Sequence, residues 1–389
     1  MSISFETLGV NSPYTARLAE RGIAAPTEIQ AQVIPRLLTG QNTLFRSATG
    51  TGKTFAYLIP LFQTLLAEPP KAWPVILVCA PTYELCSQIK AEADYLLASP
   101  PNANRFKAGL IIGAAAMGRQ IDGLKKDKPA VVIGNPGRVL QLARMGKLKL
   151  GRTAALVLDE GDRLVADELF AETRELAALV TGRRITAACS ATLSPKSRER
   201  LLPLLGEEPA TEERDDSAIL RDRIEHWAIF SEDRRKITTL RSFLAAARPR
   251  KALVFTGRGG DVGNIVSQLQ FHHIGVQGLY GDLDKKNRKQ ALDDFRRDRV
   301  HVLITTDLAA RGLDIPGISH IIALDVPAEG DPYIHRAGRT GRAGKTGIMV
   351  SIGDEDEMRR LAGLEKRLGI IVYPKELYQG RVVAPEPLE

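Results

Sequence analysis

The stretch that most constrains the fold is residues 47–54, which read Ser-Ala-Thr-Gly-Thr-Gly-Lys-Thr. A β-prone run, Asn-Thr-Leu-Phe, comes before it, and a helix-prone run, Phe-Ala-Tyr-Leu-Ile, follows. A strand, a glycine-punctuated turn and a Lys-Thr pair that opens a helix form a phosphate cradle, because the glycines let backbone N–H groups face an anion. The sequence therefore predicts a nucleoside triphosphate site. The alternative is a glycine-rich loop that only caps a helix.

We expect the residues of this loop to have distinct roles in nucleotide binding. Lys53 brings positive charge to the β- and γ-phosphates, and the Thr54 hydroxyl holds Mg²⁺ at the start of the helix. Ser47 stands where the strict pattern has glycine, so the turn departs slightly from the consensus. We expect the whole loop to contact the nucleotide: Ser47, Ala48, Thr49, Gly50, Thr51, Gly52, Lys53 and Thr54.

Bulk properties narrow the class of protein. A chain of 389 residues is too long for one compact core and predicts two domains. A net charge of +8 and a pI near 9.4 are compatible with a nucleic-acid partner, and equally with a merely basic soluble protein. The beginning of the chain lacks a signal-peptide pattern, and no apolar run is long enough to cross a bilayer, so we expect no membrane partner. The three cysteines, without C-x-x-C spacing, favour a reducing, cytoplasmic location.

Short, continuously apolar runs alternate with amphipathic runs through most of the chain. This pattern is typical of a parallel sheet that helices cover on both faces. The expected strands are 75–78, 108–112, 131–133, 155–158 and 185–188, then 227–230, 252–255, 276–280, 302–305, 320–324 and 348–351. An acidic, polar stretch separates the two groups. We therefore predict two α/β domains at 1–205 and 223–376, a linker at 206–222 and a short tail at 377–389.

Carboxylates follow one of these strands at the edge where ligands bind in open α/β sheets. Residues 159–162 read Asp-Glu-Gly-Asp, directly after the strand at 155–158. Asp159 is placed to hold Mg²⁺ through water, and Glu160 is placed to orient or deprotonate an attacking water. An acidic cap on the next helix is the alternative. After the following strand, Ser190 and Thr192 offer hydroxyls that can relay hydrogen bonds from this site.

The second half of the chain carries arginines in a glycine-rich setting. Residues 335–342 read His-Arg-Ala-Gly-Arg-Thr-Gly-Arg, with arginines at three-residue spacing. Phosphoryl transfer needs positive charge on the γ-phosphate in the transition state, and an arginine from another domain supplies it. A basic surface helix, the alternative, would not need the glycines. We expect Arg339 and Arg342 to stabilise the γ-phosphate.

Together these motifs resemble those of the DEAD-box RNA helicases, in order and spacing, from about residue 5 to about residue 374. The resemblance implies two tandem RecA-like domains that bind ATP, Mg²⁺ and RNA. Residues 5–30 resemble the family's Q motif, in which Gln30 reads the adenine edge with Phe5 and Thr27 nearby. In residues 306–314, Gly312 and Asp314 would contact the nucleotide, Asp314 through the ribose. The residues implied to couple the ATP state to RNA binding are Asp162, Ser190, Thr192, His335 and Arg336.

The resemblance also implies an RNA-binding track that contacts phosphates and sugars, with little sequence preference. Its residues here are Pro81, Thr82, Gly113, Pro136, Gly137, Arg138, Gly281, Asp282, Arg288 and Thr306. Three neighbours depart from the family pattern: Tyr83 replaces an arginine, Ala114 a glycine and Asn135 a threonine. We therefore expect weaker or differently arranged RNA binding in the first domain. Two further departures are Ile23, in place of an aromatic residue, and Gly161, in place of alanine.

The implied function is that of an RNA-dependent ATPase and ATP-dependent RNA helicase. Closure of two domains on ATP and RNA would locally unwind short duplexes, in a monomer whose RNA target a protein partner selects. Two alternatives stay open at this point. One is an ATP-gated RNA clamp or scaffold with little unwinding. The other is a DNA-directed superfamily 2 helicase, against which Gln30 and the Asp-Glu-x-Asp spelling argue.

Overall fold

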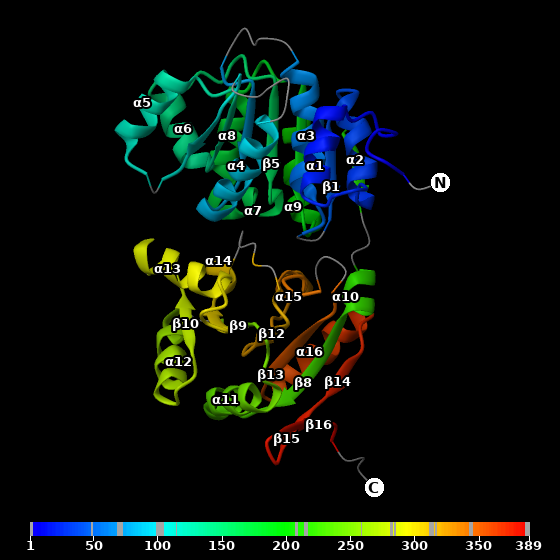
Figure 1. Ribbon diagram of the computed structural model, residues 1–389, viewed down its shortest axis with the longest axis vertical. Coiled ribbons are helices and arrows are strands. Elements are labelled where there is room, and N and C mark those ends of the chain that lie inside the picture. Colours follow the sequence, from blue (N-terminus) through cyan, green and yellow to red (C-terminus); the bar gives the residue numbers. More distant parts are fainter. Residues whose placement is uncertain are drawn as a thin grey trace. The chain divides into compact units, whose positions relative to one another are not determined.

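The protein is described by a computed structural model that covers residues 3–47, 50–67, 73–98, 105–113, 115–206, 209–213, 217–257, 259–280, 283, 285–310, 315, 317–341 and 345–385. The chain divides into two compact units, Met1–Arg214 and Asp215–Glu389. Each unit is built on a seven-stranded sheet with helices packed on both faces (Figure 1). The predicted fold class, two RecA-like α/β domains in tandem, is confirmed.

The sheet of unit 1 has the order β3-β4-β2-β5-β6-β1-β7, and the neighbouring strands are parallel. Its strands are β1 (Thr43–Arg46), β2 (Ile76–Cys79), β3 (Ala108–Ile111), β4 (Val131–Gly134), β5 (Ala155–Asp159), β6 (Ile185–Ser190) and β7 (Ala210–Glu213). Its helices are α1 (Ser12–Glu20), α2 (Glu28–Leu38), α3 (Lys53–Leu65), α4 (Tyr83–Leu97), α5 (Met117–Asp127), α6 (Pro136–Arg144), α7 (Gly161–Leu164), α8 (Asp167–Leu179) and α9 (Pro195–Leu205).

Successive strand residues of unit 1 face two different cores. On β2, Ile76 and Val78 pack into the core that α1–α4 cover, whereas Leu77 and Cys79 pack into the core of α5–α9. Because side chains alternate across a sheet, a strand buried on both faces must be apolar at every position. This explains why the strands were visible as continuous apolar runs.

Unit 2 repeats the arrangement with the order β10-β11-β9-β12-β13-β8-β14, again with parallel neighbours. Its strands are β8 (Ile224–Phe230), β9 (Ala252–Phe255), β10 (Val276–Leu279), β11 (Val302–Thr305), β12 (His320–Ala323), β13 (Gly347–Gly353) and β14 (Val372–Pro374). Its helices are α10 (Ser217–Arg223), the 3₁₀ helix η1 (Asp233–Arg235), α11 (Lys236–Ala247), α12 (Gly259–Phe271), α13 (Lys285–Arg296), α14 (Asp307–Ala310), α15 (Gly330–Ala337) and α16 (Glu355–Leu368).

The stretch expected to be a linker, residues 206–222, is not one throughout. It contains β7, which pairs in parallel with β1, and α10, and the division between the units falls at Arg214. Glu212 of β7 forms an ion pair with Arg36 of α2. An edge strand has only one neighbour and tolerates charged side chains, so its acidic sequence, Ala-Thr-Glu-Glu, resembled a loop.

The stretch expected to be a short tail, 377–389, also contains secondary structure. Strands β15 (Glu376–Tyr378) and β16 (Arg381–Val383) form an antiparallel hairpin. Gln379 and Gly380, with φ of 47° and 74°, make the two-residue turn in which both central residues need positive φ. Leu377 and Val382 pack against the α11–α12 core. Across the described ranges no helix is both long and apolar enough to cross a membrane.

Candidate nucleotide and RNA sites

The phosphate loop joins the carboxyl end of β1 to the start of α3. Gly50 and Gly52 have φ of 83° and 88°, a conformation that favours glycine, and Gly52 precedes the first turn of α3. The buried Lys53 ammonium donates to the backbone oxygen of Ser47, 2.6 Å away. This contact folds the lysine back over the loop. Ala48 and Thr49, which we expect to contact the nucleotide, lie outside the described residues.

Ser47 has a structural role that the sequence did not indicate. It is fully buried, its hydroxyl donates to Thr51 Oγ1 at 2.7 Å, and its N–H donates to the Ser190 carbonyl at 3.0 Å. A glycine at this position would keep the backbone bond and lose the hydroxyl bond. The serine therefore ties the beginning of the loop to its far side and to β6.

The Q-motif residues fasten α2 to the same loop. Thr27 and Gln30 form a capping box at the start of α2. The Gln30 amide also donates to the Gly52 carbonyl at 3.0 Å, and the Thr27 hydroxyl donates to the Thr51 carbonyl at 2.8 Å. These bonds lock the loop to α2. Phe5, by contrast, is buried in the α1–α4 core.

The Asp159 carboxylate, at the end of β5, accepts hydrogen bonds at both oxygens. The Tyr57 hydroxyl of α3 donates to Oδ2 at 2.8 Å, whereas the Glu160 N–H and the Cys189 thiol donate to Oδ1 at 2.9 and 3.1 Å. Burial, reinforced by the nearby carboxylate, raises the pKa of Tyr57 and of Cys189 well above their ordinary values, so both remain protonated donors. Sequence reasoning had noted neither residue as a partner of Asp159.

Glu160 adopts a left-handed backbone conformation, with φ of 51° and ψ of 52°. This conformation is unfavourable for a residue with a side chain, and such strain concentrates at functional sites. Gly161 then begins α7, where an added Cβ would lie 3.2 Å from both methyls of the buried Leu201. The glycine in the Asp-Glu-Gly-Asp motif therefore accommodates Leu201.

The last carboxylate of the motif, Asp162, is hydrogen-bonded to Ser190 at the end of β6 and to Thr192 just beyond it. The Ser190 hydroxyl donates to Asp162 Oδ1, and the Thr192 hydroxyl donates to Oδ2 at 3.0 Å. The Thr192 N–H in turn donates to the Ser190 hydroxyl at 3.2 Å. This network joins the acidic motif to the end of the next strand through hydrogen bonds.

The expected RNA track of unit 1 lies at the carboxyl edge of the sheet. Thr82 caps α4, and Pro136 occupies the first turn of α6. Arg138 donates to the Gly113 carbonyl at 2.7 Å, which brings two expected RNA contacts together. Among the departures, Tyr83 is 48% exposed, and the Asn135 amide donates to the Ala80 carbonyl at 3.0 Å. Ala114 lies outside the described residues.

Gly137 and Pro81 complete this edge. A Cβ on Gly137 would approach the Glu172 carboxylate of α8 to 2.7 Å, so the glycine permits α6 to pack closely there. Pro81 follows β2 and is partly buried.

In unit 2, Arg336 is held inside the fold. It is 3% exposed, its guanidinium makes two parallel bonds to the Asp307 carboxylate at 2.8 and 2.6 Å, and it donates to the Asp325 carbonyl at 2.6 Å. These contacts link α15 to α14. The expected coupling role of Arg336 stays a prediction, and its contacts here are structural. Arg339 follows α15 and is mostly buried.

The expected RNA contacts of unit 2 are partly described. Arg288 of α13 donates to the Ala309 carbonyl at 3.0 Å, and the Thr306 hydroxyl accepts from the Ala309 N–H at 3.3 Å. Both therefore meet at α14. The predicted residues Gly281, Asp282, Gly312, Asp314 and Arg342 lie outside the described residues.

A buried histidine positions the helix that carries His335 and Arg336. His226 of β8 lies between the Leu220 carbonyl, 2.9 Å from Nε2, and the Tyr333 hydroxyl, 2.8 Å from Nδ1. Since a carbonyl only accepts, Nε2 carries the proton and Nδ1 accepts from Tyr333. Burial lowers the pKa of His226. The sequence offered no signal for this pair, which is 107 residues apart.

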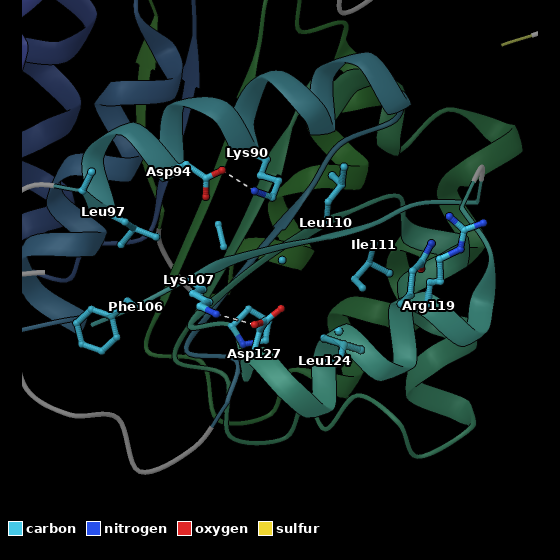
Figure 2. Close-up of a pocket in the computed structure, with 16 residues that line it drawn as sticks. Lys90, Asp94, Leu97, Phe106, Lys107, Leu110, Ile111, Arg119, Leu124 and Asp127 are labelled. Atoms are coloured by element: carbon cyan, nitrogen blue, oxygen red, sulfur yellow. Dashed lines mark hydrogen bonds and ion pairs between the residues drawn. The ribbon is translucent and has the colours of Figure 1, made fainter. Parts of the chain in front are cut away.

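A hollow of about 730 Å³ lies elsewhere in unit 1. It runs between α4, the edge strand β3 and α5 (Figure 2). Within it, Lys90 pairs with Asp94 at 2.5 Å and Lys107 pairs with Asp127 at 2.6 Å. None of its lining residues is a predicted ATP or RNA contact.

A phosphate loop beside an Asp-Glu pair, at the carboxyl edge of a parallel sheet, defines a P-loop nucleoside triphosphatase with RecA-like domains. The family model "DEAD/DEAH box helicase" matches residues 27–201, and "Helicase conserved C-terminal domain" matches residues 235–344. The chain is 35% identical to the DEAD-box ATP-dependent RNA helicase CshC of Bacillus cereus, over 94% of this chain and 92% of that protein. The chain belongs to the family of DEAD-box ATP-dependent RNA helicases.

Other relatives and structures agree with this assignment. The probable ATP-dependent RNA helicase YfmL of Bacillus subtilis is 33% identical, over 90% of each chain. The structure also resembles that of a Saccharomyces cerevisiae Dbp5 variant bound to RNA and ADP BeF3. That likeness has a TM-score of 0.84 and 26% identity, over 96% of each chain.

Proposed function

We propose that this chain is an RNA-dependent ATPase that remodels or locally unwinds short RNA duplexes through ATP-driven domain closure. The observation that carries the proposal is the hydrogen-bonded path from the phosphate loop to the acidic motif and β6. Ser47 contacts Ser190, and Ser190 contacts Asp162. A change at the nucleotide can thus reach the strand that ends beside the motif.

In this proposal the residues of unit 1 bind and orient ATP, and two arginines of unit 2 complete the site. Lys53 attracts the β- and γ-phosphates, and Gln30 holds the adenine edge beside the loop. Glu160 orients the attacking water and accepts its proton, which general-base catalysis requires. Arg339 and Arg342 neutralise charge that develops on the γ-phosphate.

Mg²⁺ fits the residues present, and we propose that Thr54 and Asp159 hold it. Both side chains contact the Tyr57 hydroxyl, so they share one small polar space. A hydroxyl and a carboxylate are the oxygen donors that this hard cation prefers. Bound there, the ion neutralises phosphate charge. Asp159, held by Tyr57, Cys189 and Glu160, is oriented to bind it through water.

RNA is the proposed partner, contacted through backbone phosphates by the track at the carboxyl edge of unit 1 and by Arg288 and Thr306 of unit 2. The structural likeness to an RNA-bound Dbp5 supports this partner. We further propose a cytoplasmic monomer whose RNA target is selected by a protein partner.

A specific observation favours the RNA clamp as a second candidate. Tyr83 replaces a cationic contact, and the Asn135 amide is turned toward Ala80. Fewer phosphate contacts in unit 1 would weaken the strain that closure places on a duplex.

Strand separation and ATP hydrolysis, measured side by side, decide between these candidates. A 10-base-pair RNA duplex with a single-stranded extension should be separated only with ATP, and RNA should stimulate hydrolysis more than DNA of the same sequence. Hydrolysis without strand separation would establish the clamp. Equal or greater stimulation by DNA would contradict the RNA-directed activity.

A further inference from the structure

A second hollow of unit 1, about 380 Å³, has a strongly basic lining. Its charged lining residues are all lysines: Lys125, Lys128, Lys147 and Lys149. They come from two separate segments, the end of α5 and the loop after α6. The rest of the lining is apolar or glycine, so no carboxylate opposes the lysines within the lining.

This lysine pocket lies at the edge of the sheet opposite to the nucleotide loop. Its lining residues Pro74 and Pro129 come just before β2 and β4, at the amino ends of those strands. The phosphate loop follows the carboxyl end of β1, which runs in the same direction. The pocket is therefore separate from the predicted ATP site and RNA track.

The positive charge of the pocket is available to a ligand. The four lysines are exposed, and among the residues that the structure describes no ion pair neutralises any of them. Nearby cations differ: Arg144 pairs with Glu175 and Lys107 with Asp127. A lysine cluster without carboxylates is an electrostatic match for a polyanion.

An aromatic ring stands beside the lysines. Trp73 lines the pocket and is only partly buried, and its ring packs against Phe106 with centroids 6.3 Å apart. Lysines next to an indole are the combination that binds single-stranded nucleic acid, because phosphates pair with the cations and unstacked bases stack on the ring.

The lysine pocket is continuous with the groove along β3. Leu124 and Pro129 line both hollows, and Phe106 of the groove contacts Trp73 of the pocket. At the other end of the groove lie Ile111 and Arg119 (Figure 2). Ile111 is the last residue of β3, two positions before the expected RNA contact Gly113.

We propose that unit 1 has a second RNA-binding site, in which the lysine pocket and Trp73 bind single-stranded RNA that leaves the track at the carboxyl edge and follows β3. The proposal rests on the RNA-directed function proposed above. Because lysines contact phosphates, the site binds without sequence preference and depends strongly on salt. It gives RNA a contact that does not involve the ATP-binding loop.

The test compares oligouridines of 10 and 40 nucleotides on the full chain. The shorter strand occupies the track alone, whereas the longer strand also reaches the lysine pocket. Lys147→Gln with Lys149→Gln removes two exposed cations, and Arg360→Gln with Lys366→Gln on α16 removes two elsewhere as a matched control. Affinity is measured by fluorescence anisotropy from 50 to 200 mM salt.

For the 40-mer, the pocket variant should bind several-fold more weakly, with a salt slope flatter by about 1.4, the value for two lost phosphate contacts on a single strand. The control should match the wild type with both strands. If the pocket variant and the wild type bind the 40-mer with equal affinity and slope, the second site is wrong.

Stimulation of wild-type ATP hydrolysis by the 10-mer separates this proposal from the one it rests on. If the 10-mer stimulates ATP hydrolysis but the pocket variant and the wild type show the same salt dependence of 40-mer affinity, only the second site is overturned. Absence of stimulation by either RNA would overturn the RNA-directed function. A 4-thiouridine 40-mer should also crosslink to the peptide that contains Trp73, and crosslinks confined to the carboxyl edge would contradict the pocket.

Discussion

At the scale of single residues, the Asp159 carboxylate depends on donors that come from three parts of the chain. Tyr57 lies on α3, Cys189 on β6, and the third donor is the adjacent N–H of Glu160. Such a carboxylate is oriented before any ligand binds, which is the arrangement that electrostatic catalysis needs.

Tyr57→Phe removes one of these donors and leaves a buried carboxylate oxygen without it. We expect a loss of about 1–3 kcal/mol in the free energy of unfolding, the usual cost of an unsatisfied buried group. ATP hydrolysis should fall as well, because Asp159 loses its orientation. Urea denaturation and steady-state hydrolysis measure the two effects.

Tyr95→Phe is a matched control, since the Tyr95 hydroxyl donates to the Arg17 carbonyl away from the acidic motif. It should lower stability and leave the hydrolysis rate near that of the wild type. If Tyr57→Phe hydrolysed ATP at the wild-type rate, the tyrosine would not position Asp159.

Gly52→Ala should lower stability and ATP affinity by more than the strain of a positive φ alone would explain. The added Cβ would overlap the Gln30 amide, which donates to Gly52 itself. Gly22 has a similar φ of 73° with open space around it. Gly22→Ala should therefore cost only about 1 kcal/mol of stability, whereas Gly52→Ala should also weaken ATP binding, measured by calorimetry. Equal ATP affinities would contradict the role of the Gln30–Gly52 contact.

Some of this site was predictable from local sequence and some was not. Lys53 and Thr54 follow from a loop motif, because the motif itself builds the turn. Tyr57 and Asp159 are 102 residues apart, and their contact exists only once α3 packs beside β5. The hydroxyl bond from Ser47 needed the folded loop, so the sequence indicated only an off-pattern residue.

At the scale of elements, the His226–Tyr333 contact holds α15 to β8. Burial lowers the pKa of His226, and the Leu220 carbonyl opposes that shift. The folded state therefore prefers the neutral ring, whereas the unfolded chain takes up a proton near pH 6.5. The stability that this contributes is complete above about pH 6.5 and is lost as the pH falls through the lowered pKa.

We expect the urea concentration at the unfolding midpoint of unit 2 to decrease as the pH is lowered from 6.5. The decrease should be less steep in His226→Gln. In a Trp73→Phe background, Trp227 is the remaining tryptophan and its fluorescence reports on β8. A residual slope is expected from His320, whose pKa burial also lowers. An identical pH dependence in the two proteins would exclude His226 as a source.

Element prediction succeeded for most strands, including the edge strands β3 and β10, and it missed the two opposite edge strands, β7 and β14. Strands such as β2, β4 and β9 are apolar and buried at every position, so pattern alone located them. β7 lies at the edge of its sheet, where charged residues are tolerated. Because its sequence includes Glu212 and Glu213, it lacks the apolar run by which the other strands were predicted. The Gln-Gly turn of the β15–β16 hairpin was a usable signal, since both positions have positive φ.

At the scale of the whole molecule, two similar sheets carry different chemistry. Unit 1 holds the phosphate loop and the acidic motif, and unit 2 holds Arg336 and Arg339 near α15. The fold and the family are established, whereas the domain limits and the roles of individual site residues stay predictions. Arg342 and Asp314, among others, lie outside the described residues.

The most direct test of the central claim is the rate of ATP hydrolysis with and without single-stranded RNA, in the wild type and in Glu160→Gln. The variant keeps the size of the side chain and removes the base, so ATP binding should persist while the RNA-stimulated rate falls by about 10²–10⁴. Glu168→Gln, an exposed change on α8, is the control. RNA should stimulate the wild type strongly at low salt. An unstimulated wild type, or a fully active Glu160→Gln, would contradict the account.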